Sequence, residues 1–475
     1  MLFSYKKRHS FRKSRILGAI LSLALLTGLF SPVTANADET DLFHWPAGPL
    51  LSSEGAVLIE AETGAVLFEK NGTEQFYPAS TTKLMTALLA LENSALGETV
   101  TVSRNAVYDI DVDSSRIWVD VGEELSMEES LYALMLPSAN DLAYAIAEHI
   151  GGTKADFADM MNKRAEELGC VNTHFMNPHG LDEADHYTCP ADLARIMRPL
   201  VKNSTFVKIS GSKNHKIPKT NLCAEDRWVL NTHLMIRGTY AYEGVVAGKT
   251  GHTDLAGANL VTCAKRGNMT LIAVIMKAPD DTALYNDTAT LLNYGFDNFA
   301  TYSVTDEQFS LANDVPPLFN GEDTIQLTRK NIITTDSGIV VLPSSASLSD
   351  ITKEVQLTQL TDFAEGKNLI GRVTYSYGTR TVGSSNIIYN NKGPAFTITP
   401  EELAEVPEQS EGTPATSETD GQTKTENAPK KDRLPLIIGI ILGCICFLIG
   451  VYFIFVELPY RKKRSAYLKK KNRRF

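Results

Sequence analysis

Two β-hairpin patterns, one near each end of a long segment, most constrain what this chain can fold into. The first joins the apolar segments Val57–Glu60 and Ala65–Glu69. The second joins Leu260–Ala264 and Leu271–Met276 through the turn residues Arg266-Gly267-Asn268. Short apolar segments separated by turn residues are typical of hairpins. Hairpins rather than crossovers imply antiparallel pairing, so we expect an antiparallel sheet built from both ends of this segment.

Helical patterns fill the space between the hairpins and follow the second one. Apolar residues recur at helical spacing in Ser80–Leu91, Met127–His149, Lys154–Leu168 and Thr282–Phe299. The second of these patterns is broken by Pro137-Ser138-Ala139-Asn140. We therefore predict an α/β (α+β) fold, in which helices cover an antiparallel sheet and some of them form an all-helical subdomain.

The pattern changes after residue 300 to short strands separated by turn residues. These strands are Ile332–Thr335, Gly338–Leu342, Val355–Leu360, Leu369–Tyr377 and Ile387–Tyr389. Such spacing is typical of a small β-rich domain. We predict a first domain over residues 38–300 and a β-rich domain over 301–395.

The N-terminus has the features of a secretory signal. Basic residues without any acidic one precede the apolar run Ile16–Phe30, and Ala35-Asn36-Ala37 offers small residues for cleavage. We predict a signal peptide over residues 1–37. An uncleaved membrane anchor is the alternative, although the run is short for a span.

The C-terminus has the features of a membrane anchor. Residues 396–433 contain hardly any large apolar side chain and predict a disordered linker. Leu434–Val456 is uncharged and long enough to cross a hydrocarbon core of about 30 Å, so we predict a transmembrane helix there. Residues 457–475 are strongly basic. By the positive-inside tendency this tail is cytoplasmic, which places residues 38–433 outside the cell.

The net charge argues against one class of partner, and the cysteine count bears on disulfides. The chain has a formal net charge of −10, and without its basic ends the remainder carries about −24. So acidic a surface argues against nucleic acid as a partner. Four cysteines lie in the predicted external part, and buried thiols or a disulfide both remain open: Cys170, Cys189, Cys223 and Cys263.

Three short motifs carry chemistry only when taken together. Ser80 and Lys83 stand one helical turn apart, and a serine hydroxyl becomes a nucleophile when a nearby amine has a lowered pKa and accepts its proton. Ser138-Ala139-Asn140 interrupts a helix and places a hydroxyl and an amide where they can face a cleft. Gly248-Lys249-Thr250-Gly251-His252 opens a strand and supplies a second cation. Each motif alone is common, as an N-cap, a helix-initiating turn or an ordinary strand.

In this order the three motifs resemble those of penicillin-binding proteins and class A β-lactamases. Four longer stretches, residues 76–92, 115–152, 174–181 and 248–261, are similar to the serine D-alanyl-D-alanine carboxypeptidases, the low-molecular-mass penicillin-binding proteins. The resemblance covers about residues 50–300 and implies a β-lactamase/transpeptidase-like fold. It implies removal of the terminal D-alanine from peptidoglycan pentapeptide stems, which limits cross-linking, and covalent inhibition by β-lactam antibiotics. It also implies a bacterial cell, so we expect a single-pass protein of the cell membrane with its catalytic domain outside the cytoplasm.

The resemblance also implies a role for each motif residue. Ser80 is acylated by the penultimate D-alanine, Lys83 accepts its proton, and Ser138 passes a proton to the leaving D-alanine. Asn140 holds the substrate amide and Lys83.

On the strand, the resemblance implies that Lys249 and Thr250 face the terminal carboxylate. A glycine at position 251 is slim enough to let a substrate backbone lie against the strand edge. The backbone N–H groups of Ser80 and His252 form the oxyanion hole. Relatives often add an arginine for the carboxylate, for which Arg227 and Lys277 are candidates here.

Parts of the sequence also fit other classes of site and protein. Histidine and aspartate gather between residues 174 and 186, but without metal-ligand spacing, so we expect neither a metal nor a cofactor. A β-lactamase needs a deacylating glutamate, and residues 150–190 lack the Glu-x-x-Leu-Asn segment that usually supplies it. A D,D-endopeptidase of cross-links and a non-catalytic wall-binding or sensor protein on the same scaffold both remain open.

Overall fold

A computed structural model describes residues 43–304, 332–336, 338–358, 360 and 362–397 of the 475-residue chain. The predicted signal peptide, transmembrane helix and basic tail lie outside the described residues, as does the predicted linker apart from residues 396 and 397. No helix within the described ranges is both long enough and apolar enough to cross a membrane.

The sheet predicted from the two hairpins is present and has five strands. They are β1 (Gly55–Glu60), β2 (Val66–Lys70), β7 (Val245–Thr253), β8 (Gly257–Arg266) and β9 (Met269–Ala278). Their order across the sheet is β2-β1-β9-β8-β7. Both predicted hairpins form, and antiparallel pairing of β1 with β9 joins them into one sheet. Strand β7 therefore lies at one edge, with a partner only on its β8 side.

Helices surround this sheet, and two very small sheets lie among them. The helices are η1 (Ala79–Thr82), α2 (Lys83–Asn93), α3 (Arg104–Tyr108), α4 (Met127–Met135), α5 (Asn140–Gly151), α6 (Lys154–Glu167), α7 (Pro190–Lys202), α8 (Ser204–Ser210), α9 (Leu234–Arg237) and α10 (Asp281–Asn298). The small sheets pair β3 (Thr99–Thr101) with β4 (Glu124–Ser126), and β5 (Asn214–Ile217) with β6 (Arg227–Leu230). The predicted helix boundaries are confirmed to within a few residues, with one difference: the α-helix expected from Ser80 begins at Lys83, after a 3-10 turn.

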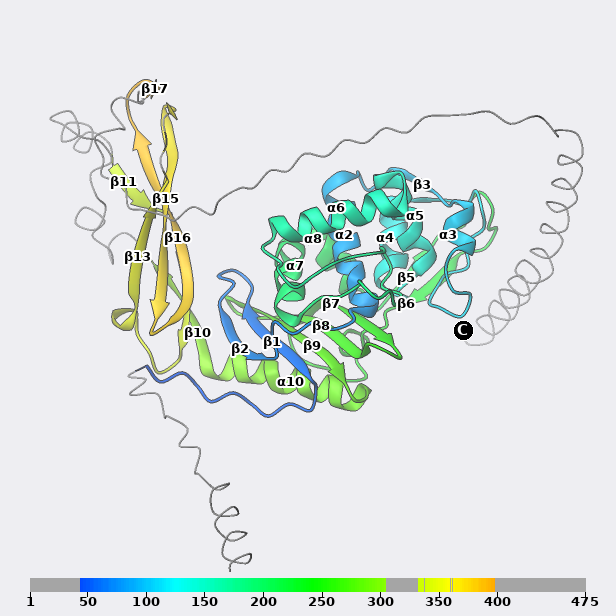
Figure 1. Cartoon of the computed structure of the whole chain (residues 1–475), viewed down its shortest axis with the longest axis horizontal. Helices are drawn as coiled ribbons and strands as arrows, with labels where there is room; N and C mark the ends of the chain where they lie inside the picture. The colour runs from blue at the N-terminus through cyan, green and yellow to red at the C-terminus, as the bar shows by residue number, and fades with distance from the viewer. Residues whose placement is uncertain (1–42, 305–331, 337, 359, 361, 398–475) are drawn as a thin grey trace, which may run out of the picture. The chain divides into compact units, whose positions relative to one another are not determined.

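Alternation along the strands separates two hydrophobic cores, because successive side chains of a strand point to opposite faces of the sheet. Val57 and Ile59 of β1 face a core shared with most of the helices, including α2, α4, α5 and α7. Leu58, between them, faces a core shared with α10 through Leu291 and Leu292. Figure 1 shows this layering, with α10 on one face of the sheet and the other long helices on the opposite face.

The predicted short strands after residue 300 also form, with corrections to their ends. The elements are β10 (Phe299–Val304), β11 (Ile332–Thr335), β12 (Gly338–Pro343), η3 (Leu348–Asp350), β13 (Thr352–Leu357), β14 (Asp362–Phe363), β15 (Gly366–Tyr377), β16 (Arg380–Asn391) and β17 (Phe396–Thr397). One sheet has the order β10-β12-β16-β15-β13, with β11 also paired to β16. The strand expected at Val355–Leu360 begins and ends three residues earlier, at the positions that pair with β15. The strand expected at Ile387–Tyr389 is far longer, because Arg380–Ser385 pairs with β15 despite its weak strand propensity. Strand β10 starts before residue 301, so the boundary predicted there falls inside a strand.

Candidate active site

Ser80 lies in a turn that is held in place by hydrogen bonds from strand β8. Asn259 of β8 donates from its side-chain amide to the carbonyl oxygens of Tyr77 and Pro78, at 2.9 and 3.1 Å. Ala79, between Pro78 and Ser80, has a φ of 48°, which is unfavourable for a residue with a side chain. Such strained residues occur at functional sites, where the surrounding contacts enforce them. The turn thus fixes the partly exposed Ser80 hydroxyl at the start of α2.

Lys83 lies fully buried beside this hydroxyl. Its Nζ is 2.9 Å from Ser80 Oγ and donates to Asn140 Oδ1 at 2.5 Å and to the carbonyl oxygen of His179 at 2.6 Å. Burial lowers the pKa of Lys83 well below its usual range, and the charge of Lys249 lowers it further. The buried carboxylate of Asp141 acts in the opposite direction. With two N–H groups directed at Asn140 and His179, a neutral amine would direct its lone pair at the Ser80 hydroxyl.

The turn that interrupts the predicted helix brings Ser138 and Asn140 to the same place. Ser138 has a φ of 63°, and α5 begins at Asn140. Asn140 contacts Lys83 directly, as described above. The Ser138 hydroxyl is buried and has no hydrogen-bond partner among the described residues. An unpaired buried hydroxyl costs about 1 to 3 kcal/mol, a cost that a substrate group pairing with it would remove.

The free edge of β7 presents backbone groups in a fixed pattern. Ser210 Oγ accepts from the Gly248 N–H and donates to the Gly248 carbonyl, at 3.0 and 2.8 Å, so the backbone of Gly248 points away from β8. Since backbone direction alternates along a strand, the N–H and C=O groups of Thr250 and His252 point the same way. Lys249 Nζ donates to the Thr250 carbonyl at 2.8 Å. The His252 N–H therefore lies on the free edge, as an oxyanion donor requires.

Lys249 and Thr250 bring charge and a hydroxyl to this edge. Lys249 is buried, and burial lowers its pKa to about 7. The Thr250 hydroxyl lies 2.7 Å from that of Thr232, which precedes α9. The side chain of His252 is exposed.

Gly251 is required for a reason that the sequence did not reveal. We expected its small size to make room for a substrate backbone. A Cβ atom at this position would lie 2.9 Å from the Pro78 carbonyl oxygen and 3.0 to 3.1 Å from the backbone nitrogens of Thr81 and Ser80. Because the first distance is shorter than real Cβ contacts and the other two are tighter than most, glycine lets β7 pack directly against the Ser80 turn. The Ser80 and His252 N–H groups are brought close by this packing.

Neither candidate for a second carboxylate-binding cation is free. The buried side chain of Arg227 pairs with Glu123 at 2.6 Å. The exposed side chain of Lys277 pairs with Glu54 at 2.9 Å. Both charges are therefore already paired with a carboxylate of the chain.

The histidines between residues 174 and 186 form structural hydrogen bonds. His186 joins Thr82 to the Met176 N–H, and His179 Nδ1 accepts from the Leu181 N–H. Burial lowers the pKa of His186 to about 3, so its ring is neutral. Within the described part of the chain, no group of three or more His, Cys, Asp or Glu residues could hold a metal ion.

Cys170, Cys189, Cys223 and Cys263 are free thiols in the structure. Three are buried, and burial raises the pKa of each to about 12: Cys170, Cys189 and Cys263. Such thiols remain protonated and unreactive at neutral pH.

Three groups that support the site residues were not predicted from the sequence. Asn259 positions the Ser80 turn, the His179 carbonyl positions Lys83, and Ser210 pairs with the free edge of β7 at Gly248. Asn259 immediately precedes the predicted strand Leu260–Ala264, where a polar residue gives no signal of its own. A backbone carbonyl and a lone serine give no sequence signal of their own.

A hydroxyl beside an amine of lowered pKa is suited to acyl transfer, in which the amine takes the proton as the oxygen attacks a carbonyl. The fold and this pair define a class of enzymes that combine a serine nucleophile with a lysine base. The profile of the D-alanyl-D-alanine carboxypeptidases, peptidase family S11, matches residues 44–280.

Individual relatives agree with this match. The D-alanyl-D-alanine carboxypeptidase DacF of Bacillus subtilis is 32% identical over 308 residues, which are 64% of this chain and 76% of that protein. DacA of Haemophilus influenzae is 27% identical over 384 residues, 78% of this chain and 93% of that protein. The chain therefore belongs to the D-alanyl-D-alanine carboxypeptidase family, peptidase S11.

Solved structures confirm the predicted fold. Penicillin binding protein 5 from Haemophilus influenzae superposes with a TM-score of 0.56 at 25% identity, covering 74% of this chain and 99% of that one. Penicillin binding protein 6B from Escherichia coli gives 0.54 at 26% identity, covering 72% and 96%. An antiparallel sheet covered by helices, followed by a β-rich region, is thus the fold of a penicillin-binding protein.

Proposed function

We propose that this chain is a serine-type carboxypeptidase that removes the terminal D-alanine from peptidoglycan pentapeptide stems and so limits cross-linking. The observation that carries the proposal is the position of Lys83 Nζ, fully buried and 2.9 Å from Ser80 Oγ. The family membership supports the same substrate, because the relatives named above are D-alanyl-D-alanine carboxypeptidases.

In acylation, Ser80 Oγ attacks the carbonyl carbon of the penultimate D-alanine, and its proton passes to the neutral Lys83 amine. The carbonyl oxygen becomes an oxyanion between the N–H groups of Ser80 and His252. Collapse of this intermediate breaks the C–N bond, and the proton held by Lys83 passes through the Ser138 hydroxyl to the nitrogen of the leaving D-alanine. The unpaired Ser138 Oγ supports this relay, because it is free to donate and accept.

Before the bond breaks, the substrate is held along the edge of β7. Asn140 binds its amide, and Lys249 with Thr250 binds the terminal carboxylate. Gly251 keeps the strand against the Ser80 turn, as its contacts suggest.

Water then attacks the ester carbonyl, Ser80 Oγ leaves with a proton, and the shortened peptide departs. A β-lactam acylates Ser80 in the same way but leaves slowly, because the amine freed by ring opening stays attached to the acyl group and occupies the place of the departed D-alanine. A β-lactamase hydrolyses such an adduct rapidly by holding the attacking water with a carboxylate. The group from residues 150–190 that contacts Lys83 is the backbone carbonyl of His179, which is not a carboxylate. Glu166, a glutamate in the same range, is exposed near the end of α6. These positions favour a penicillin-binding protein over a β-lactamase.

The cellular setting is proposed from the sequence. Cleavage after Ala37 would release residues 38–475 to the outer face of the bacterial membrane. Leu434–Val456 would anchor the protein as a single span, and residues 457–475 would stay in the cytoplasm. Residues 396–433 would tether a catalytic domain, which ends with α10, and a β-rich domain, which begins with β10, near newly made peptidoglycan.

The test is mass spectrometry of the purified chain incubated with a muropeptide pentapeptide and, separately, with a cross-linked dimer. Loss of one D-alanine from the pentapeptide is the expected result. Cleavage of the dimer alone would favour the endopeptidase. No cleavage and no reaction with penicillin would favour a non-catalytic wall-binding protein.

A further inference from the structure

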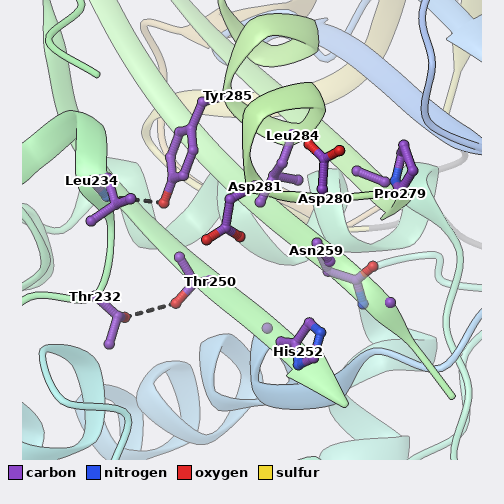
Figure 2. Close-up of a pocket in the computed structure, with 14 residues that line it drawn as sticks. Thr232, Leu234, Thr250, His252, Asn259, Pro279, Asp280, Asp281, Leu284 and Tyr285 are labelled. Carbon is purple, nitrogen blue, oxygen red and sulfur yellow. Dashed lines mark hydrogen bonds between the residues drawn. The ribbon is translucent and has the colours of Figure 1, made fainter. Parts of the chain in front are cut away.

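A cavity of about 610 Å³ adjoins the proposed catalytic strand. Its walls come from β7, from the start of β8, from the residues around α9 and from the start of α10, and they include Thr250, His252, Asp281 and Tyr285. Figure 2 shows these side chains around the hollow, with the Asp281 carboxylate directed into it from the first turn of α10. Pockets that bind small molecules commonly measure about 300 to 1,000 Å³.

The cavity lies on the side of the strand to which the leaving residue points. When the scissile carbonyl binds the His252 N–H and the terminal carboxylate binds Thr250, the leaving residue extends along β7 toward the N-terminal end of that strand. Beyond Thr250 lies Thr232, whose hydroxyl is 2.7 Å from that of Thr250 and which also lines the cavity. A side chain on the leaving residue would therefore enter the cavity, where a methyl group would fill only a small part.

The charges around the cavity are acidic. No lysine or arginine is among the residues that line it, whereas Asp280 and Asp281 are. Asp280 Oδ1 accepts the Ala283 N–H as the cap of α10, at 2.8 Å. The Asp281 carboxylate is exposed and lies in the first turn of α10. Lys249 is not among the lining residues, and its Nζ donates to the Thr250 carbonyl at the strand edge.

We propose that this cavity is the subsite for the leaving residue and that Asp281 makes it select for a cationic side chain. The substrate class extends from a terminal D-alanine to D-alanyl bonds whose leaving residue is longer and carries an amine. Thr250 and Lys249 still bind the α-carboxylate, while the amine reaches Asp281. This inference rests on the proposed function, because it assumes the acyl-enzyme at Ser80.

The experiment measures kcat/KM with the full-length chain for four acyl peptides that differ only in the leaving residue. D-alanine is the reference, D-norleucine tests size, D-lysine adds a charge to the same length, and D-glutamate reverses the charge. The parent should prefer D-lysine to D-glutamate by about tenfold, since one ion pair and one like-charge repulsion at an exposed site each change rates several-fold. D-norleucine should lie between them and should not be worse than D-alanine.

Variants then assign the preference to one carboxylate. Asp281→Asn should bring D-lysine and D-glutamate to within about twofold of each other, as expected when one exposed charge is removed. Asp297→Asn, at the other end of α10, is the matched control and should keep the parent order. Asp281→Glu, which keeps the charge, should keep most of the preference.

The outcomes separate this inference from the proposed function. Equal rates for D-lysine and D-norleucine in the parent, or an Asp281→Asn variant with the parent order, would overturn the subsite while D-alanine release continues. If no substrate is cleaved and penicillin does not react, the proposed function fails instead. The parent series decides the inference even if a variant does not fold.

Discussion

Lys83 Nζ lies 2.9 Å from Ser80 Oγ, although the two residues belong to different elements: Ser80 to the 3-10 turn η1 and Lys83 to the first residue of α2. In a 3-10 turn residues three apart lie almost one above the other, which brings the hydroxyl directly over the amine. The amine is buried and surrounded by acceptors, and its lowered pKa follows from that burial and from Lys249. This pair can exchange a proton without any rearrangement of the backbone.

Replacing Lys83 by arginine should abolish activity while the protein stays folded. A guanidinium keeps the positive charge but does not lose its proton at any working pH, so it cannot accept the proton of Ser80. We expect kcat/KM for the pentapeptide to fall at least about a thousandfold, in the upper part of the range for loss of a general base. Circular dichroism and the thermal midpoint serve as the folding control. Activity within threefold of the parent would mean that Lys83 acts only through its charge.

The preference for a free carboxylate should depend on pH. Burial lowers the pKa of Lys249 to about 7, so above that pH the free enzyme loses the charge that pairs with the carboxylate. A charged hydrogen bond contributes roughly 1.5 to 3 kcal/mol, so at pH 6 the acid pentapeptide should exceed its C-terminal amide by about ten- to a hundredfold in kcat/KM.

The ratio of acid to amide should decline between pH 7 and 9. In Lys249→Gln the ratio should be small at every pH, because no titrating cation remains. A parent ratio that stays constant from pH 6 to 9 would show that Lys249 does not bind the carboxylate.

The buried Lys249 should also lower the free energy of unfolding. Its pKa is about 7 in the folded protein and near 10.5 when unfolded, so between these values the unfolded chain binds the extra proton. The penalty is full below pH 7 and is relieved as pH rises toward 10.5. The free energy of unfolding of the parent should therefore rise relative to Lys249→Met by up to about 1.36 kcal/mol per pH unit in this window. Urea unfolding at pH 6, 8 and 9.5 measures this, and parallel profiles for the two proteins would contradict it.

Asn259 should act by positioning the Ser80 turn. Its amide joins the carbonyl groups of Tyr77 and Pro78 to the backbone N–H of Lys277. Asn259→Ala should slow acylation by penicillin by about tenfold or more, because small misplacements of reacting groups are costly. Asn93→Ala, at the far end of α2, is the control. Equal acylation rates, with equal thermal stability, would leave Asn259 without a role.

Much of the fold could be predicted because periodicity and turns are local signals. The two hairpins and the helices after Met127 and Lys154 appear where the patterns placed them. The strand Arg380–Asn391 was mostly missed, because its pairing with β15 outweighs the poor propensity of Gly383 and its serine neighbours.

The site residues also fall into two groups, those with a local sequence signal and those without one. Ser80, Lys83, Ser138, Asn140 and Lys249 were predicted from motifs in which spacing or order carries the signal. Asn259 and Ser210 lie near those residues only after folding, so nothing local identifies them. The packing role of Gly251 was missed for the same reason: its close neighbours belong to the Ser80 turn, far away in sequence.

The most direct test of the account is peptide mapping by mass spectrometry after the purified protein has reacted with penicillin. The account predicts one penicilloyl ester per chain, on Ser80, that persists for many minutes and is absent from Ser80→Ala. Pentapeptide added before the antibiotic should slow its formation, since both compounds occupy the same edge of β7. An adduct on any other residue, or no adduct on a folded protein, would contradict the claim that Ser80 is the nucleophile.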